Sequence, residues 1–192
     1  MRQMDGKRKL IRPDRKYLQS YEEAREEYRL AFQPGEFPFL DLSAEEFIEK
    51  APAFEKGKEL PHGWVPATYL WLVNETEFLA EVSIRHELTE ALLRFGGNVG
   101  YWVRISAWKQ GIGTELLRRA LRYIRGNLPM DRVLITCNDD HFVSARIIEK
   151  NGGILQDRIE NPNGERAKIT RRYWIPVGNC TEGRADGETD DF

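Results

Sequence analysis

The stretch GYWVRISAWKQGIGTELLRRAL (residues 100–121) decides the fold. Its apolar beginning predicts a strand that ends near Val103, and its second half predicts an amphipathic helix over 114–125. Between them, Gly-Ile-Gly (111–113) leads into the helix, where the backbone can approach a ligand closely. The unpaired amides and positive dipole end of such a helix suit an anion. A glycine turn that only begins a helix is the plainer alternative, and the G-x-G spacing alone slightly favours it.

Strand-like segments lie on both sides of this stretch. TYLWLV (68–73) and FLAEVSIR (78–85) are separated by Asn-Glu-Thr-Glu and predict an antiparallel hairpin. VLITC (133–137) is continuously apolar, which is typical of a strand buried on both faces. Because a helix separates 98–103 from 133–137, a right-handed crossover predicts that these two strands are parallel neighbours.

The remaining segments complete a layered fold. Ser20 and Ser43 are each followed three residues later by Glu, which predicts a capping box at the start of two helices. The pattern predicts a mixed sheet in an α/β or α+β fold. The further elements expected are helices at 20–32, 43–56 and 142–150, and closing strands at 154–160 and 167–175.

Composition and charge limit the classes of protein. The chain has 192 residues, of which 41% are hydrophobic and 31% charged, with a formal net charge of −2. These values are typical of one globular domain and argue against a dedicated nucleic-acid binder. Apolar runs are too short to span a bilayer and no secretory leader is recognisable, so a cytoplasmic protein without membrane contact is expected. The two cysteines, Cys137 and Cys180, fit neither a zinc site nor a disulfide framework.

The two ends of the chain differ from its middle. Residues 177–192 are acidic and nearly devoid of apolar side chains, which predicts a disordered tail. A flexible N-terminus over 1–8 is also expected, which leaves one folding unit over 9–176.

The central stretch resembles the GNAT superfamily of acetyl-CoA-dependent N-acetyltransferases. The cofactor loop of that family reads Gln/Arg-x-x-Gly-x-Gly/Ala before a helix, and Trp108, Gly111 and Gly113 stand at the matching positions. The resemblance implies a GNAT fold, a strongly bent mixed sheet flanked by helices, whose strands at 98–103 and 133–137 splay apart around the pantetheine arm. The similarity spans most of 9–176 and continues through SIRHELTEALLRFGGNVGYWVRIS (83–106), DRVLITCNDDHFVSARIIEKNGG (131–153) and RRYWI (171–175).

The resemblance also implies where the cosubstrate, acetyl-CoA, lies. Its pantetheine arm is expected against the last residues of the strand at 98–103, and its pyrophosphate on the amides that open the following helix. No metal is expected, because the cosubstrate brings the activated acyl group. The residues implied are Val103, Ile105, Lys109, Gln110, Gly111, Gly113 and Thr114, with His141 and Ser144 beside the distal arm.

Three positions depart from the family pattern. Trp108 replaces the usual Gln or Arg of the loop, which predicts weaker cosubstrate binding through the backbone amides that remain. His141 stands where the family usually has Asn. Ile148 occupies the place of the Tyr that protonates the departing thiolate in many relatives, and no neighbouring Tyr in the sequence obviously replaces it.

Two side chains are candidates for the base that takes the proton of the acceptor amine. Alternation along the strand puts Glu81 on one face with Arg85, where burial among apolar neighbours would raise the pKa of Glu81. His86 lies on the other face and has an ordinary pKa near ~6.5, suited to proton transfer. Each has a structural alternative: Glu81 pairs with Arg85 or with a neighbouring strand, and His86 is hydrogen-bonded at a strand end.

Three functions are compatible with these features. The first is an N-acetyltransferase that moves an acetyl group from acetyl-CoA to a primary amine in a ternary complex. The second is an acyl-CoA-binding regulatory or degenerate relative with little turnover, which Trp108 and Ile148 favour. The third, a dinucleotide-binding oxidoreductase, lacks the third glycine and the strand-adjacent glycine of such a site, and ranks last.

The acceptor is expected to be a small-molecule or peptide amine. Its pocket is predicted among the N-terminal helices, the loop at 57–67 and the stretch 86–97. Members of the family often dimerise, so a homodimer remains open. The aromatic residues that could line this pocket, each also a candidate for the core, are Trp64, Tyr69, Trp71 and Phe95.

Overall fold

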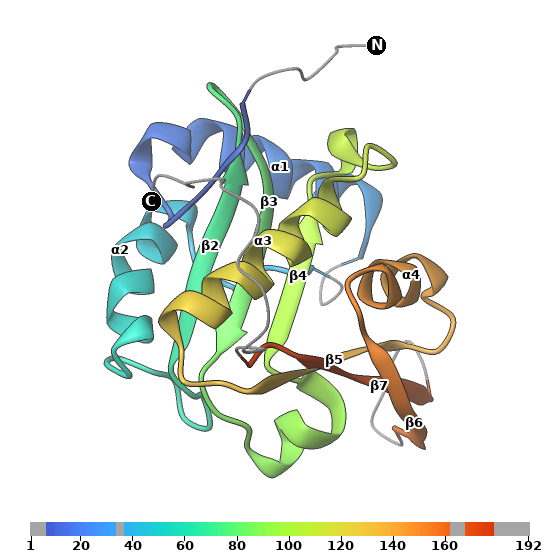
Figure 1. The fold of residues 1–192 in the computed structure, drawn as a ribbon. Helices are drawn as coiled ribbons and strands as arrows, with labels where there is room; N and C mark the ends of the chain where they lie inside the picture. Colours follow the sequence, from blue (N-terminus) through green and yellow to red (C-terminus); the bar gives the residue numbers. More distant parts are fainter. Residues whose placement is uncertain (1–6, 34–36, 162–167, 179–192) are drawn as a thin grey trace.

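The computed structural model describes residues 7–33, 37–161 and 168–178 (Figure 1). Two sheets carry helices on their faces, and short 3-10 turns precede α1 and α3. The elements are β1 (Lys9–Ile11), η1 (Arg15–Tyr17), α1 (Leu18–Ala31), α2 (Ala44–Glu55), β2 (Ala67–Val73), β3 (Phe78–Arg85), the π-helical turn η2 (Leu92–Gly96), β4 (Val99–Val103), η3 (Ile105–Ala107), α3 (Ile112–Asn127), β5 (Arg132–Asn138), α4 (Phe142–Lys150), β6 (Ile154–Glu160) and β7 (Ile169–Pro176).

The larger sheet has four antiparallel strands in the order β1-β2-β3-β4. Every residue of β2 is buried, because helices cover both faces of the sheet. The predicted hairpin of β2 and β3 is confirmed. Its register pairs Glu81 with Trp71 of β2 on one side and with Trp102 of β4 on the other. An acidic residue therefore sits between two indole-bearing residues in the middle of the sheet.

The smaller sheet, in the order β5-β7-β6, is also antiparallel. No ladder joins β4 to β5 within the described residues, so the two strands, predicted as parallel neighbours, adjoin at one end but do not pair. The amide of Asn98 donates to the carbonyl of Leu134 at 2.7 Å, and the amide of Leu134 donates to Oδ1 of Asn98 at 2.9 Å. A side chain completes the second bond because the two strands are already separating. The splayed arrangement implied by the resemblance is thus confirmed (Figure 1).

Two hydrophobic clusters lie on opposite faces of the larger sheet. The helices α1 and α2 pack on one face, in a cluster rich in rings such as Tyr21, Phe47 and Trp71. The helix α3 packs on the other face through aliphatic side chains such as Leu117 and Ile124. The apolar stripe predicted for the helix at 114–125 is therefore the buried face of α3.

One predicted capping box is present and the other is not. At the start of α2, Oγ of Ser43 accepts from the amide of Glu46 at 3.1 Å, and the Glu46 carboxylate accepts from the amide of Ser43 at 2.9 Å. Ser20 instead lies inside α1. Its Oγ accepts from the amide of Phe78 at 3.0 Å and from Nη1 of Arg104 at 3.1 Å. Tertiary contacts with β3 and with the residue after β4 thus replace the expected local cap.

The described chain continues past the predicted boundary at residue 176. Val177 is buried, and the amides of Val177 and Gly178 both donate to the carbonyl of Asp131 at 2.8 Å. These two residues therefore belong to the folded unit. The rest of the predicted tail, 179–192, lies outside the described residues. At the other end, Arg8 forms an ion pair of 2.7 Å with Glu115 of α3, whereas 1–6 lie outside the described residues.

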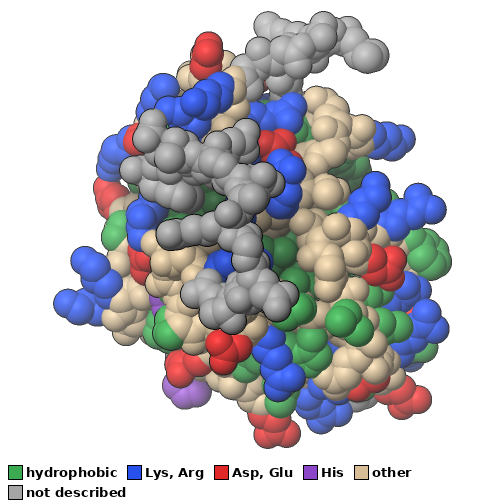
Figure 2. All heavy atoms as spheres, viewed as in Figure 1, with side chains coloured by type: hydrophobic (Ala, Val, Ile, Leu, Met, Phe, Trp, Pro, Cys, Tyr) green, Lys and Arg blue, Asp and Glu red, His purple; other side chains and the backbone are tan. Residues whose placement is uncertain are grey.

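The surface carries charges of both signs. Figure 2 shows Lys and Arg side chains interspersed with Asp and Glu over the visible face, in keeping with the net charge of −2. Among the described helices, none has the length and apolar character needed to cross a bilayer.

Candidate active site

The turn that leads into α3 has a backbone shape suited to an anion. Lys109 and Gly111 both adopt left-handed conformations, with φ of 62° and 77°. A Cβ built on Gly111 would meet nothing within 4 Å, so the space before this residue is open. At Gly113 a Cβ would lie 2.8 Å from Cδ1 of Ile147, so this glycine allows α3 to pack closely on α4. The two glycines of the motif therefore have different roles.

Among the described residues, the amides at the start of α3 have no helical acceptor, and they lie beside this space. The helix begins at Ile112, two residues before the predicted start, and its first bond runs from the Glu115 amide to the Gly111 carbonyl at 3.0 Å. The amides of the residues before Glu115 form no helical bond, and they lie at the positive end of the helix dipole. The arrangement fits a pyrophosphate on the residues predicted for it: Gln110, Gly111, Gly113 and Thr114, with Lys109 exposed beside them.

A carboxylate of α1 holds the segment before this turn. Glu27 accepts from the amide of Ser106 at 2.9 Å, from Oγ of Ser106 at 2.8 Å and from Nη2 of Arg104 at 2.8 Å. Burial alone would raise the pKa of Glu27, but the bonds from Ser106 and Arg104 outweigh it and lower that pKa. The end of β4 is thereby fixed against α1.

Trp108 ties the turn back to β4. Its Nε1 donates to the carbonyl of Val103 at 2.8 Å, and the hydroxyl of Tyr28 donates to the same oxygen at 2.9 Å. That carbonyl is therefore saturated, and the contact predicted for Val103 with the pantetheine arm is restricted to its other groups. Ile105, also predicted to contact the arm, packs against the aromatic cluster under α1.

A cavity of about 270 Å³ lies where β4 and β5 separate. Two residues predicted to border the distal arm, His141 and Ser144, line it together, with His141 exposed at the start of α4. The hydroxyl of Tyr101 lies 2.9 Å from Oγ of Ser144. Cys137 also lines the cavity, and burial raises the pKa of its thiol to about 11, so it stays protonated.

Tyr101 is a functional candidate that the sequence reasoning missed. Ile148, at the usual position of the family tyrosine, is fully buried in the core. Tyr101 reaches the same region from β4, and burial raises the pKa of its hydroxyl, which keeps its proton near neutral pH. A signal was present, because Tyr101 lies two residues before Val103 and so shares its strand face.

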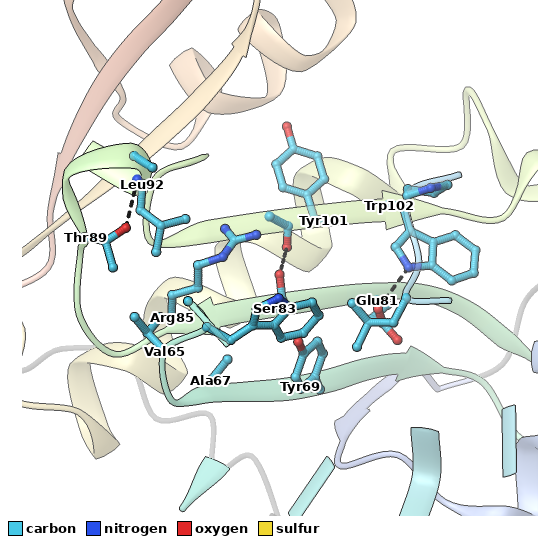
Figure 3. A pocket seen from close by; sticks show the side chains of 16 residues that line it. Val65, Ala67, Tyr69, Glu81, Ser83, Arg85, Thr89, Leu92, Tyr101 and Trp102 are labelled. Carbon is cyan, nitrogen blue, oxygen red and sulfur yellow. Dashed lines mark hydrogen bonds between the residues drawn. The ribbon is translucent and has the colours of Figure 1, made fainter. Parts of the chain in front are cut away.

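A larger cavity of about 490 Å³ adjoins the first (Figure 3). The loop at 57–67 and the stretch 86–97, predicted to form the acceptor pocket, contribute walls to this cavity through 63–65 and through Thr89, Ala91 and Leu92. The connection between α1 and α2, rather than the helices themselves, supplies Pro38 and Leu40. Of the four aromatic residues predicted for this pocket, Trp64 and Tyr69 line it; Trp71 is buried and Phe95 is not among the described lining residues.

Glu81 reaches the wall of this cavity from the middle of β3. Its Oε2 accepts from Nε1 of Trp71 at 2.8 Å and from the hydroxyl of Tyr21 at 3.3 Å, and its Oε1 accepts from Nε1 of Trp102 at 3.1 Å. Burial raises the pKa of Glu81, and these three bonds offset only part of the effect. The expected rise is confirmed, whereas the three aromatic donors were not predicted.

Arg85 does not pair with Glu81. Its Nη1 donates to the carbonyls of Gly96 and Gly97 at 3.3 and 3.2 Å. Figure 3 shows its side chain rising from β3 toward Tyr101, with the guanidinium near Leu92. Among the described residues, both cavities are lined by Arg85, Gly100 and Tyr101.

His86 lies on the other face of β3, apart from Glu81. Oγ1 of Thr68 donates to Glu55 at 3.2 Å and therefore accepts from Nε2 of His86 at 2.8 Å. Burial lowers the pKa of His86, against the opposing effect of Glu55. His86 lines neither cavity in the described part of the chain, so the structure does not bring the two predicted bases together. No cluster of three or more potential metal ligands occurs among the described residues.

Comparisons with solved structures find the same fold in acetyltransferases. A microcin C7 self-immunity acetyltransferase, MccE, solved with acetyl-CoA and AMP, has a TM-score of 0.67 and 15% identity, over 90% of this chain and 94% of that chain. An acetyltransferase from Salmonella typhimurium that modifies the N-terminal serine of ribosomal protein L7/L12 has a TM-score of 0.64 and 15% identity, over 91% and 97%. A GNAT-family acetyltransferase from Streptococcus pneumoniae has a TM-score of 0.63 and 13% identity, over 90% and 100%.

These similarities establish the fold. A comparison with curated proteins finds no match. The sequence itself matches the acetyltransferase (GNAT) domain family over residues 10–154. Because this match covers well over half of the chain, the protein belongs to the GNAT acetyltransferase family.

Proposed function

We propose that the protein transfers the acetyl group of acetyl-CoA to the primary amine of an acceptor within a ternary complex. The observation that carries this proposal is the wall shared by the two cavities, formed by Arg85, Gly100 and Tyr101. An acceptor in the larger cavity and a thioester in the smaller one would meet at Tyr101. Holding both reactants in this way removes much of the entropic barrier to the reaction.

The residues around the splay fit the cosubstrate. Acetyl-CoA, when bound, supplies the activated acyl group. The unpaired amides of the first turn of α3 would hold its pyrophosphate, with Lys109 beside them. The open space before Gly111 and the cavity between β4 and β5 give room for the chain of the cosubstrate.

Two side chains are assigned to proton transfer. Glu81 would take the proton of the acceptor amine, since its pKa is raised by burial and its Oε1 accepts only one bond in the described part of the chain. Tyr101 would donate its hydroxyl proton toward the departing sulfur, in place of the tyrosine that Ile148 replaces. His86 has no part in this scheme, because its imidazole is bonded to Thr68 on the other face of the sheet.

The second candidate function is an acyl-CoA-binding regulatory protein with little turnover. Two observations favour it: Ile148 is fully buried, and Trp108 and Tyr28 occupy the carbonyl of Val103. Tyr101 weighs against it, because its hydroxyl supplies the proton donor that Ile148 lacks.

Thermal unfolding with acetyl-CoA, CoA and NAD(H), followed by a CoA-thiol release assay on an amine panel, tests both candidates. Acetyl-CoA at 100-fold over Kd should add about 2.7 kcal/mol to the free energy of unfolding, whereas NAD(H) should add nothing. Release of the thiol only when an amine is present supports the transferase. Tight binding of acetyl-CoA with an intact thioester across the panel supports the regulatory protein, and no shift with any CoA species contradicts both.

A further inference from the structure

We propose that the acceptor carries a carboxylate as well as its amine, and that Arg85 binds this carboxylate in the larger cavity. The inference rests on the proposed function, because it assigns this cavity to the acceptor. It names a substrate class, small amines of the amino-acid type, and gives Arg85 the role of selecting them.

Other arginines of this protein show what their side chains do when a carboxylate is in reach. Arg12 places Nε and Nη2 on the two oxygens of Glu55, at 3.1 and 2.8 Å. Arg172 places the same two nitrogens on Asp157, at 2.7 and 2.6 Å. This side-on fork matches the geometry of a carboxylate and gives two parallel bonds.

Arg85 has the same fork without a carboxylate. Only its Nη1 is bonded, to the two carbonyls of η2 and the residue after it, and no acidic group of the described residues lies within 4.0 Å. The side chain is half-buried, so its charge has lost part of its hydration without gaining a counter-ion. An anionic ligand on Nε and Nη2 would supply that counter-ion.

The surroundings of Arg85 favour an anion over a cation. Tyr69 lines the same cavity, and its hydroxyl has no bond to another described residue. Burial raises the pKa of Tyr69 to about 12, so the hydroxyl remains a donor. Gly100 lies beside the guanidinium, since a Cβ there would be in van der Waals contact with Nη1 and Nη2, 3.7 Å from each.

The other charged residue of the cavity wall does not serve as the partner of Arg85. Glu81 lies four residues away on the same strand, about 13 Å at the usual rise of a β-strand. Both of its oxygens already accept bonds from Tyr21, Trp71 or Trp102. The two groups therefore offer separate places, a cationic one for a carboxylate and an anionic one nearer an amine.

The position of Arg85 separates it from the pyrophosphate of the cosubstrate. Ser83 and Ile84, just before Arg85, pair with Gly100 and Val99 at the beginning of β4. The anion-binding turn follows the other end of β4, about 10 Å farther along the strand. A cavity of about 490 Å³ also suits a small ligand.

Matched acceptors and variants test the inference. Glycine and ω-amino acids of increasing length would each be compared with the corresponding carboxamide, which lacks the negative charge, in acetyl transfer and in calorimetric binding to the CoA-loaded protein. For the wild type we expect at least one acid to exceed its carboxamide by about tenfold or more in kcat/KM or in affinity, as two charge-assisted bonds imply. Arg85→Gln should abolish the preference, and Arg85→Lys should restore part of it.

The control is Arg94→Gln, which removes an exposed cation of η2 that lines neither cavity in the described part of the chain. This variant should keep both the preference for acids and the acetyl-CoA affinity of the wild type. The inference is overturned if carboxamides match or exceed the acids in both assays, or if Arg85→Gln retains the preference. Absence of thiol release with measurable, Arg85-dependent binding of acids would contradict the proposed transfer and leave the carboxylate site standing.

Discussion

The hydroxyl of Tyr101 lies 2.9 Å from Oγ of Ser144, so a side chain of β4 reaches the first turn of α4 across the splay between the sheets. The contact spans the cavity in which the thioester is proposed to lie. It also places a phenol near α4, the helix in which Ile148 replaces the tyrosine of many relatives. Ile148 itself is buried in the core. In the proposed reaction, the proton donor at this place would therefore come from β4 and not from α4.

Tyr101→Phe should lower kcat for acetyl transfer by about 10²-fold, the lower end of the range for a general acid. The Km for acetyl-CoA should change little, because the ring remains in place. Ser144→Ala, which removes only the partner of the hydroxyl, should cause a smaller fall. Steady-state kinetics of the two variants at saturating acetyl-CoA would make the comparison. Equal kcat values for Tyr101→Phe and the wild type would exclude Tyr101 as the proton donor.

Local patterns predicted the elements well, and the errors arose where distant residues meet. The box of Ser43 and Glu46 depends on neighbours in the sequence and is present, whereas Ser20 is used by Phe78 and Arg104. The burial of Glu81 followed from strand alternation. Its three donors did not, because Tyr21 comes from α1 and the tryptophans from two other strands.

The splay between β4 and β5 also depends on residues that are far apart in the sequence. A buried apolar strand after a helix predicts a parallel neighbour, but the pairing depends on how two sheets diverge. Asn98, directly before β4, forms two hydrogen bonds to Leu134 of β5, one through its backbone amide and one through its side-chain oxygen. That divergence opens the smaller cavity, which Tyr101 and Arg85 line, and no spacing in the sequence predicts it.

Glu81→Gln should change how stability depends on pH. The folded pKa of Glu81 is raised above its ordinary value of 4.5, so ionisation penalises the folded state and wild-type stability falls as pH rises from 4.5 through the folded pKa. The stability of the variant does not fall in this way. However, its side-chain NH2 group meets the indole N–H of Trp102, so two donors face each other, which lowers the free energy of unfolding by about 1–3 kcal/mol. The difference in the free energy of unfolding between the wild type and the variant, measured by urea unfolding, should therefore become smaller as the pH rises. A difference that does not change with pH would show that the pKa of Glu81 is not raised in the folded protein.

Gly111→Ala should weaken acetyl-CoA binding and lower stability. The φ of 77° costs a side-chain-bearing residue about 1–3 kcal/mol, and the new methyl group would project into the open space proposed for the pyrophosphate. Gly126→Ala is the control, because Gly126 lies in α3 with no atom within 4 Å of a new Cβ and should gain stability by about 0.4–1 kcal/mol. Calorimetric titration with acetyl-CoA would measure the affinity of both variants, and thermal unfolding would measure their stability. Unchanged affinity in Gly111→Ala would place the pyrophosphate elsewhere.

Two truncations should separate the folded unit from the rest of the predicted tail. A chain ending at Gly178 should unfold at the temperature of the full chain and bind acetyl-CoA equally well, because the composition of 179–192 offers little apolar area to bury. A chain ending at Pro176 loses the buried Val177 and two bonds to the carbonyl of Asp131. The loss of about 2 kcal/mol expected for such a side chain corresponds to a fall of roughly 4–8 °C in Tm. Differential scanning calorimetry resolves this difference. A large fall in the Tm of the chain that ends at Gly178 would show that 179–192 packs on the folded unit.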